Sequence, residues 1–259
     1  MHGYGPSTYG DAFADSYDDW YAEISDIPST VACLAGLVAD GLAVLELGVG
    51  TGRLAIPLAA AVSARGCSVV GLDASAAMLR RLAVNDPSGS VAPILGEMVE
   101  AMPSGPFGLV FAAYNTFFNL LSSDRQLACF HAVAARLAPA AMFAVEAFVP
   151  GEQAMITDRT EGARQFIAGP VTLRSMTADR VVLSVSRSDH AAQVVEGQYV
   201  EITEDGGVRL RPCSIRYALP AELDAMATAA GMHLVHRWGS FAMDPFEVDS
   251  ERHVSVYGL

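Results

Sequence analysis

Three glycines alternate behind an acidic residue in ELGVGTG, residues 46–52, a spacing that could hold a small molecule. Glycine adopts positive φ without steric cost and lets a ligand approach the backbone closely. The apolar run AVLELG (43–48) leads into these glycines, and an amphipathic pattern over 53–64 follows them. The segment is therefore predicted to turn from a strand into a helix, whose first N–H groups lack intrahelical partners and are free to meet a ligand.

Three classes of ligand site compete for this turn. A P-loop is excluded because no Gly-Lys-Ser/Thr follows. The dinucleotide pattern G-x-G-x-x-G/A fails from Gly48, where Arg53 takes the third position, but it holds from Gly50, where Ala55 does. The pattern E-x-G-x-G-x-G matches from Glu46 onwards at every position, and its acid favours a cationic ligand over a pyrophosphate. A nicotinamide-dependent oxidoreductase stays open as the alternative.

The glycine turn resembles motif I of the class I S-adenosylmethionine-dependent methyltransferases, and two later segments are in register with it. VVGLDASAAML (69–79) ends a second predicted strand at Asp73, and Gly96-Glu97-Met98 follows a third. The resemblance implies that Asp73 binds both ribose hydroxyls, that Met78 borders the adenine, and that Glu97 meets the adenine amino group. Taken singly, each glycine could belong to a tight turn that binds no ligand, and Asp73 could be the N-cap of a helix. The expected cofactor-binding residues are Tyr17, Glu46, Gly48, Gly50, Gly52, Asp73, Ala74, Met78, Glu97, Met98 and Asn115.

The segment AAYNTFFNLL (112–121), after the fourth predicted strand, lacks the Asn/Asp-Pro-Pro-Tyr sequence used on adenine or glutamine amides in this family. Methylation of an aliphatic amine needs less catalytic assistance. Keeping a group with a pKa of about 10.4 neutral at pH 7 costs roughly 4 to 5 kcal/mol, and orientation supplies about 7 to 11 kcal/mol. We therefore expect an amine acceptor, with Asn115 facing the cofactor and Phe117 facing the acceptor. Core packing is the alternative for one of the pair Phe117 and Phe118.

Aromatic residues recur with helical spacing near the start of the chain, at Tyr9, Phe13, Tyr17 and Trp20. This stripe is compatible with a helix that docks on the core. It also resembles the aromatic lid of small-molecule N-methyltransferases of antibiotic biosynthesis, which implies that Tyr9 and Tyr17 lie over the cofactor and the acceptor. The expected catalytic residues are thus Tyr9, Tyr17 and Phe117. Because an unperturbed phenol has a pKa near 10, Tyr9 is expected to orient the amine.

The resemblance extends to the C-terminal segments RYALPAELDAMATAAGM (216–232) and RWGSFAMDPFEVDSERHVSVYGL (237–259), which are similar to the ends of lincosamide and aminosugar N-methyltransferases. It implies methyl transfer from S-adenosylmethionine, with S-adenosylhomocysteine as product, to a secondary amine of a small molecule. The acceptor implied is the proline-derived pyrrolidine nitrogen of a lincosamide precursor, late in antibiotic biosynthesis. The alternatives are an aminosugar N-methyltransferase, an O-methyltransferase, and a cofactor-binding module without catalysis.

The order of apolar runs predicts an α/β fold with a doubly wound, seven-stranded, mostly parallel sheet. Strands are expected at 43–48, 68–73, 91–95, 108–113 and 141–148, with helices at 53–64, 75–84 and 124–137 between them. From 162 to 217 the period changes to two, with a hairpin signal at 204–207, so an inserted antiparallel meander is expected. A helix at 221–230 and two strands, at 233–238 and 252–259, are expected to complete the fold. The predicted organisation is an N-terminal helical lid over 1–40, a cofactor-binding core over 41–160 and 218–259, and a substrate cover over 161–217.

Composition narrows the partners and the compartment. The formal net charge is −13, so phosphate backbones and anionic lipid are poor partners, and a small-molecule substrate is expected instead. The charge-free run 101–123 is broken by prolines and asparagines, and no leader pattern opens the chain. Four scattered cysteines predict reduced thiols and a cytoplasmic protein. A homo-oligomer is compatible with the sequence.

Two further motifs carry no chemistry. His233 and His236 form an H-x-x-H on a predicted strand, where this spacing sends the side chains to opposite faces, so no metal site is expected. No G-x-S-x-G occurs, so a serine hydrolase is unsupported. The histidines are expected to be structural.

Overall fold

A seven-stranded sheet forms the centre of the computed structural model, which describes residues 1–21, 26–151 and 167–259. Its strand order is β11-β12-β5-β4-β1-β2-β3. The five strands from β3 to β5 are parallel, and β12 pairs antiparallel with both β5 and β11. The bounds are β1 (Ala43–Leu47), β2 (Val69–Asp73), β3 (Val91–Leu95), β4 (Phe107–Ala112), β5 (Leu137–Phe148), β11 (His233–Trp238) and β12 (Arg252–Gly258).

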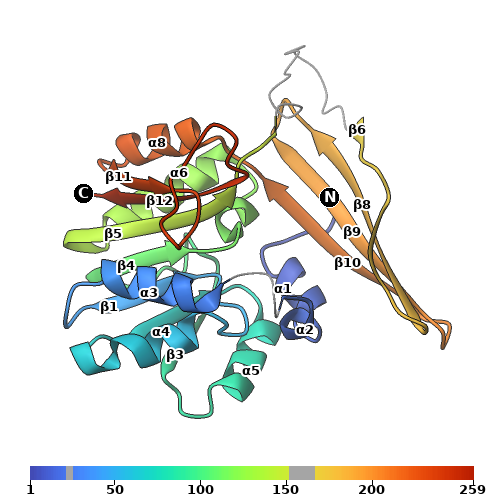
Figure 1. Cartoon of the computed structure of the whole chain (residues 1–259), viewed down its shortest axis with the longest axis horizontal. Helices are drawn as coiled ribbons and strands as arrows, with labels where there is room; N and C mark the ends of the chain where they lie inside the picture. Colours follow the sequence, from blue (N-terminus) through green and yellow to red (C-terminus); the bar gives the residue numbers. More distant parts are fainter. Residues whose placement is uncertain (22–25, 152–166) are drawn as a thin grey trace.

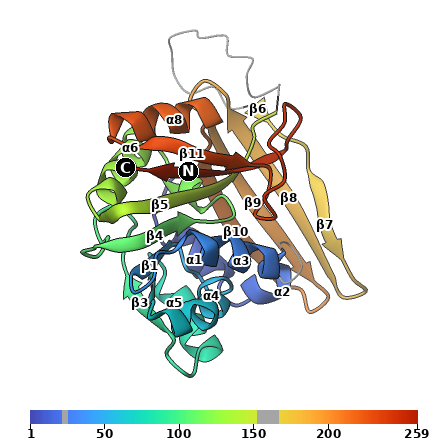
Figure 2. The ribbon, with the colours of Figure 1, turned by 60° about the vertical axis from the view of Figure 1, so that its left-hand side comes forward.

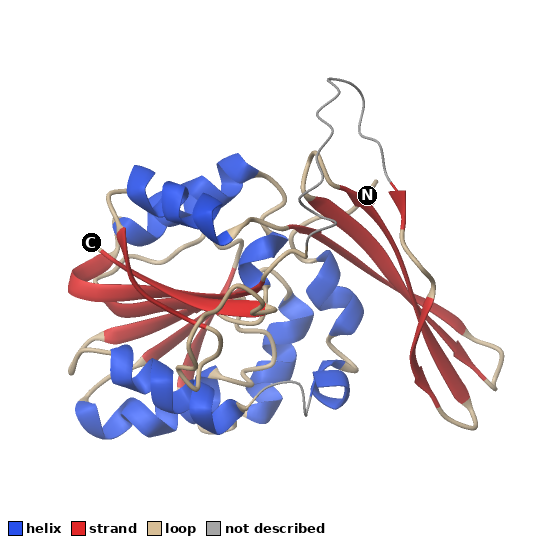
Figure 3. Ribbon diagram, turned by 45° about the horizontal axis from the view of Figure 1, so that its top comes forward, coloured by secondary structure: helices blue, strands red, loops and turns tan. Residues whose placement is uncertain are grey.

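Helices cover both faces of this sheet (Figure 3), and each face has its own apolar core. One face carries α3 (Ile27–Leu37), α4 (Ala55–Val62) and α5 (Ala76–Asn85), and the other carries α6 (Ser123–Ala134) and α8 (Pro220–Ala229). The predicted fold class is confirmed. In the described ranges, no helix has both the length and the apolar character needed to cross a bilayer.

Helix starts follow local chemistry. Ser75 caps α5 by accepting a hydrogen bond from the Met78 N–H, and Ser122 caps α6 through the Arg125 N–H. Pro220 opens α8, where its missing N–H costs nothing. By contrast, α4 follows the glycine turn, and its N-cap residue Leu54 makes no side-chain capping bond. Instead of a cap residue, the Glu46 carboxyl accepts from the Ala55 N–H, and the Gly52 carbonyl accepts from the Ile56 N–H.

A second, antiparallel sheet forms a separate layer beside the core, as Figure 2 shows. Strands β10, β9 and β8 run side by side, and β6 and β7 both pair with β8. The predicted hairpin joins β9 to β10, with Gly206 at φ +82°. The predicted boundary at 160/161 lies outside the described residues. The bounds are β6 (Ile167–Ala168), β7 (Thr172–Met176), β8 (Arg180–Asp189), β9 (Val194–Thr203) and β10 (Val208–Arg216).

Two short helices, α1 (Thr8–Phe13) and α2 (Tyr17–Tyr21), lie between the two sheets (Figure 1). The expected aromatic stripe is thus interrupted, because the chain turns at 14–16, where the Ser16 N–H bonds the Phe13 carbonyl. Helix α1 packs against both α5 and β10. We call α1 and α2 together the lid.

Buried Arg211 on β10 fastens the lid to the antiparallel sheet. Its guanidinium donates to the Ala12 carbonyl, pairs with Asp15 at 2.8 Å and with Glu201 at 2.9 Å, and lies over the rings of Phe13 and Trp20. The side chain is only 3% exposed, so these ion pairs are partly shielded from water. Arg211 therefore joins the lid to β10, and Arg209 of the same strand adds an ion pair to Asp15.

Candidate active site

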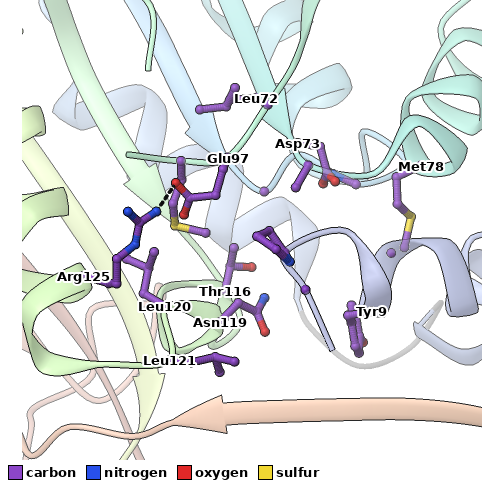
Figure 4. Close-up of a pocket in the computed structure, with 18 of the residues that line it drawn as sticks. Tyr9, Leu72, Asp73, Met78, Glu97, Thr116, Asn119, Leu120, Leu121 and Arg125 are labelled. Atoms are coloured by element: carbon purple, nitrogen blue, oxygen red, sulfur yellow. Dashed lines mark hydrogen bonds and ion pairs between the residues drawn. The ribbon is translucent and has the colours of Figure 1, made fainter. Parts of the chain in front are cut away.

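A cavity of about 240 Å³ lies where the lid meets the carboxyl ends of β1, β2 and β3, which is where ligands bind in open α/β sheets. Figure 4 shows Tyr9, Asp73 and Met78 toward one end of it, and Glu97 with Arg125 at the opposite end. Of the residues predicted from sequence, the cavity brings together Tyr9, Tyr17, Gly48, Gly50, Asp73, Ala74, Met78, Glu97 and Met98.

The glycine turn forms the floor of the cavity. Gly48 has φ +70°, and a Cβ there would lie 2.3 Å from Cγ2 of Thr116. Gly50 has φ +56°, and its N–H donates to Oδ2 of Asp73 at 2.8 Å. Gly52, at φ +88°, packs against Leu82 and does not line the cavity. The first two glycines make room at the ligand, whereas the third lets α4 and α5 pack together.

Asp73 ends β2 and faces the cavity. Its carboxylate accepts hydrogen bonds from the N–H groups of Gly50 and Ser75, both at 2.8 Å. Burial raises the pKa of Asp73, while these two donors oppose that rise. The N-cap of α5 is Ser75, whose hydroxyl donates to Asp11 of the lid. Asp73 is therefore not the cap of that helix and has acceptor capacity for a pair of hydroxyls.

Glu46 lies buried behind the turn and does not line the cavity wall. Within the described part of the chain its Oε2 meets no hydrogen-bond donor. Burial raises the pKa of Glu46 to about 8, although the Arg53 guanidinium opposes this rise. A buried acid with one unpartnered oxygen next to the glycine turn favours a ligand that brings positive charge, as a sulfonium and an ammonium do.

Glu97 stands at the far end of the cavity, after β3. It accepts a hydrogen bond from the Val99 N–H at 2.9 Å and an ion-paired one from Arg125 at 2.5 Å (Figure 4). Leu72 and Met98 supply apolar wall beside it. An acid edge with apolar faces suits a planar heterocycle that carries an amino group.

The lid places three phenols over and beside the cavity. The hydroxyls of Tyr9 and Tyr21 are 2.8 Å apart, and the rings of Tyr17 and Tyr21 stack at 4.5 Å. Burial raises the pKa of Tyr9 well above its usual range and also raises the pKa of Tyr17. These phenols are therefore neutral near pH 7, as hydrogen-bonding groups rather than phenolates.

Comparison with known proteins agrees with this geometry. A methyltransferase-domain family model matches residues 44–140. The CcbJ methyltransferase from Streptomyces caelestis is 36% identical, with 98% of this chain and 99% of that chain covered and a TM-score of 0.82. This chain belongs to the S-adenosylmethionine-dependent methyltransferases. The cofactor of the methyltransferase is S-adenosylmethionine.

Two more distant structures share the fold of the methyltransferase. CalS10, an amino pentose methyltransferase from Micromonospora echinaspora, is 19% identical, with complete coverage of both chains and a TM-score of 0.65. The sugar N-methyltransferase KedS8 from Streptoalloteichus is 18% identical, with 100% of this chain and 99% of that chain covered and a TM-score of 0.65. Among curated protein sequences, none matches the methyltransferase.

The structure contradicts the prediction that Phe117 faces the acceptor. Its ring is fully buried and packs edge-on against Phe130 and Phe143 in the core. The reason is the short helix η2 (Thr116–Asn119), a 3-10 helix in which residues three apart lie on one side. Thr116 and Asn119 therefore share the cavity side of η2, and Phe117 turns inward.

Asn115 also takes a different place from the one predicted. It has φ +65°, and its Oδ1 accepts a hydrogen bond from the Phe148 N–H at 2.7 Å. Its neighbours Tyr114, Glu146 and Arg252 line a second cavity with it, at the ends of β4 and β5. Asn115 thus ties the end of β5 to the loop after β4 and does not line the cofactor cavity.

Sequence reasoning missed part of the cavity wall of the methyltransferase. The missed residues include Tyr4, Pro6, Thr116, Asn119, Leu121 and Arg125. The 3-10 spacing of Thr116 and Asn119 is a local signal, although a four-residue helix is hard to foresee. Tyr4 and Arg125 come from the chain start and from α6, so only the tertiary fold brings them to the site.

Proposed function

We propose that this methyltransferase acts on a neutral secondary amine of a small molecule. The observation that carries the proposal is the composition of the cavity wall opposite the cofactor motifs: the Tyr9 phenol, the Asn119 amide and the apolar Leu121. Phenol and amide oxygens accept the N–H of an amine and aim its lone pair. A neutral amine needs this orientation more than it needs a strong base.

The cofactor residues hold the methyl donor in a defined place. We propose that Asp73 binds the ribose hydroxyls, that Met78 and Met98 enclose the adenine, and that Gly48 and Gly50 admit the methionine end. Bound S-adenosylmethionine supplies an electrophilic methyl group on a sulfonium. Tyr17 closes the cavity from the lid side, and Glu46 offsets positive charge from below the turn.

Proton handling separates amines from alcohols at this site. A hydroxyl acceptor needs a base as its oxygen is alkylated, whereas a secondary amine that has given its ammonium proton to water reacts as the neutral base and loses its N–H proton after methylation. In the described wall of the cavity, the carboxylates belong to Asp73 and Glu97, which lie with the cofactor motifs. Because burial raises the pKa of Tyr9, its phenol is a hydrogen-bond acceptor for the amine rather than the base.

Charge and surface favour a basic acceptor. The net charge of −13 attracts cationic amines to the protein, which then lose a proton before reaction. Aromatic rings of the lid can hold such a cation on its way in. At a finer level, we propose the proline-derived pyrrolidine nitrogen of a lincosamide precursor as the acceptor, which the sequence resemblance at the lid and at the C-terminus supports.

The test is a product assay with S-adenosylmethionine carrying a labelled methyl group. Lincosamides with a secondary pyrrolidine nitrogen, amino sugars with a secondary amine, and the same lincosamides already N-methylated are offered separately, and products are located by tandem mass spectrometry. We expect label on the nitrogen of the first compounds and none on the last. Label on a hydroxyl oxygen, or turnover of the N-methylated compounds, would refute amine methylation, and turnover of amino sugars alone would refute the lincosamide assignment.

A further inference from the structure

Arg125 lies at the adenine end of the cavity without being part of any cofactor motif. It stands in the first turn of α6, where the Ser122 hydroxyl accepts a hydrogen bond from its backbone N–H. Its guanidinium reaches back across the cavity edge to two acids, Glu97 and Glu100, which lie on the turn after β3. The side chain is 38% exposed, so half-buried rather than free in solvent.

The hydrogen bonds to Glu97 are one-sided. The Val99 N–H at 2.9 Å, the Glu100 N–H at 3.4 Å and the Arg125 Nη2 at 2.5 Å all end on the same oxygen, Oε2. In the described part of the chain, no N–H donor reaches the other oxygen, Oε1, although the Glu100 carboxyl also lies close to the Glu97 carboxyl. A carboxylate held by one oxygen has its second oxygen fixed in direction with its lone pairs available.

We propose that Arg125 is a positioning residue for cofactor recognition: it holds Glu97 by Oε2 so that Oε1 accepts a hydrogen bond from the adenine amino group. The proposal rests on the assignment of this cavity to S-adenosylmethionine and does not depend on the acceptor. A purine with a carbonyl in place of the amino group offers Oε1 a lone pair instead of a donor. Fixed in this way, Glu97 distinguishes adenine from hypoxanthine.

The neighbouring charges give Arg125 a second effect. Burial and the nearby Glu100 carboxyl raise the pKa of Glu97, and the Arg125 guanidinium opposes this rise. Cys129 of α6, which is fully buried, also faces this group and is a thiol whose pKa is raised by burial. Without Arg125, the two acids would repel each other and Glu97 would take up a proton at higher pH. A protonated Glu97 has a donor on one oxygen and only a neutral acceptor on the other, so its hydrogen bond to the adenine amino group weakens.

The test measures binding by titration calorimetry with S-adenosylhomocysteine and with S-inosylhomocysteine, which carries hypoxanthine. We expect the wild-type chain to prefer the adenine compound by about 10-fold or more, since the bond involves an ionised acceptor. Arg125→Met should reduce this preference to about 3-fold or less, and Arg125→Lys should restore part of it. As the pH is lowered, the affinity for S-adenosylhomocysteine should also begin to fall at a higher pH in Arg125→Met than in the wild type.

Two controls separate positioning from other roles. Glu97→Gln should lose the preference, and adding Arg125→Met to it should change nothing further. Arg180→Met removes an ion pair of similar exposure on the antiparallel sheet and should leave both affinities intact. The proposal would be overturned if Arg125→Met weakened the binding of both ligands equally and so kept the preference for adenine. It would also be overturned if the effects of Glu97→Gln and Arg125→Met on that preference added in the double variant. If the wild-type chain bound neither ligand, the cofactor assignment of the cavity itself would be wrong.

Discussion

The Tyr9 hydroxyl lies 2.8 Å from the Tyr21 hydroxyl, so a single hydrogen bond joins the two helices of the lid above the cofactor cavity. Tyr9 also stacks on Phe13 at 4.4 Å, which fixes its ring. Of these two phenols, only Tyr9 lines the cavity within the described residues. The pair therefore presents one oriented hydroxyl, that of Tyr9, to a ligand in the cavity.

Replacing Tyr9 with Phe should lower kcat/KM for the amine by about 2- to 10-fold, because one hydrogen bond of about 0.5–1.5 kcal/mol to the acceptor is lost. The affinity for S-adenosylhomocysteine should change little. In the wild type, the rate should rise with pH as the acceptor amine deprotonates, without a further step from Tyr9 below pH 10, since burial raises the pKa of Tyr9. Initial rates from pH 6 to 10 provide the check. The control is Tyr21→Phe, which removes the partner hydroxyl outside the cavity wall and should cost less.

Gly48→Ala should abolish measurable cofactor binding. The added Cβ would lie 2.3 Å from Cγ2 of Thr116, and the backbone there has φ +70°. Combining it with Thr116→Ser removes the clashing methyl group and should recover part of the affinity, leaving a backbone cost of about 1–2 kcal/mol. Calorimetric titration with S-adenosylhomocysteine compares the single and double variants. If the double variant bound no better than the single one, the steric explanation would fail.

Phe117→Ala should destabilise the fold by about 3–5 kcal/mol, because it empties a buried aromatic site. Chemical denaturation measures this change. The KM of the acceptor, determined on the folded fraction, should stay close to that of the wild type. Leu121→Ala is the matched variant on the cavity side and should raise that KM several-fold with a smaller stability change. If Phe117→Ala raised the KM of the acceptor and Leu121→Ala left it unchanged, Phe117 would line the acceptor site after all.

Glu46→Gln should change how stability depends on pH. Burial raises the pKa of Glu46 in the fold to about 8, whereas the unfolded chain has the ordinary value near 4.5. The stability that this proton supports is therefore full below about pH 4.5 and is lost as the pH rises through 8. The Gln variant should gain in Tm relative to the wild type from pH 5 to pH 9, with the exposed Glu247→Gln as control. If the curves of Tm against pH were parallel for the wild type and Glu46→Gln, the raised pKa of Glu46 would be contradicted.

The cofactor half of the site could be predicted because its residues follow strand ends. Gly48, Asp73 and Glu97 come directly after β1, at the end of β2 and after β3, so the parallel sheet alone brings them together. Each of the three lies next to its own strand in the sequence, and the parallel arrangement of the strands places the three strand ends side by side. The strands predicted at 91–95 and 233–238 coincide with β3 and β11.

The acceptor half could not be predicted in the same way. Whether Phe117 or Asn119 faces the cavity depends on the 3-10 geometry of a four-residue helix, which hydrophobicity does not encode. Asn115 enters a left-handed conformation that turns its amide toward Phe148. Arg125 reaches Glu97 from 28 residues away in the chain, so no sequence spacing indicates the pair.

Arg211 grips the lid and the antiparallel sheet with the same guanidinium, so the lid cannot lift without breaking those bonds or drawing β10 along. Opening the cavity on its lid side therefore requires the lid and β10 to move together or these ion pairs to break. A strand of the antiparallel sheet, more than 180 residues later in the chain than the lid, thus helps to fix the lid over the cavity.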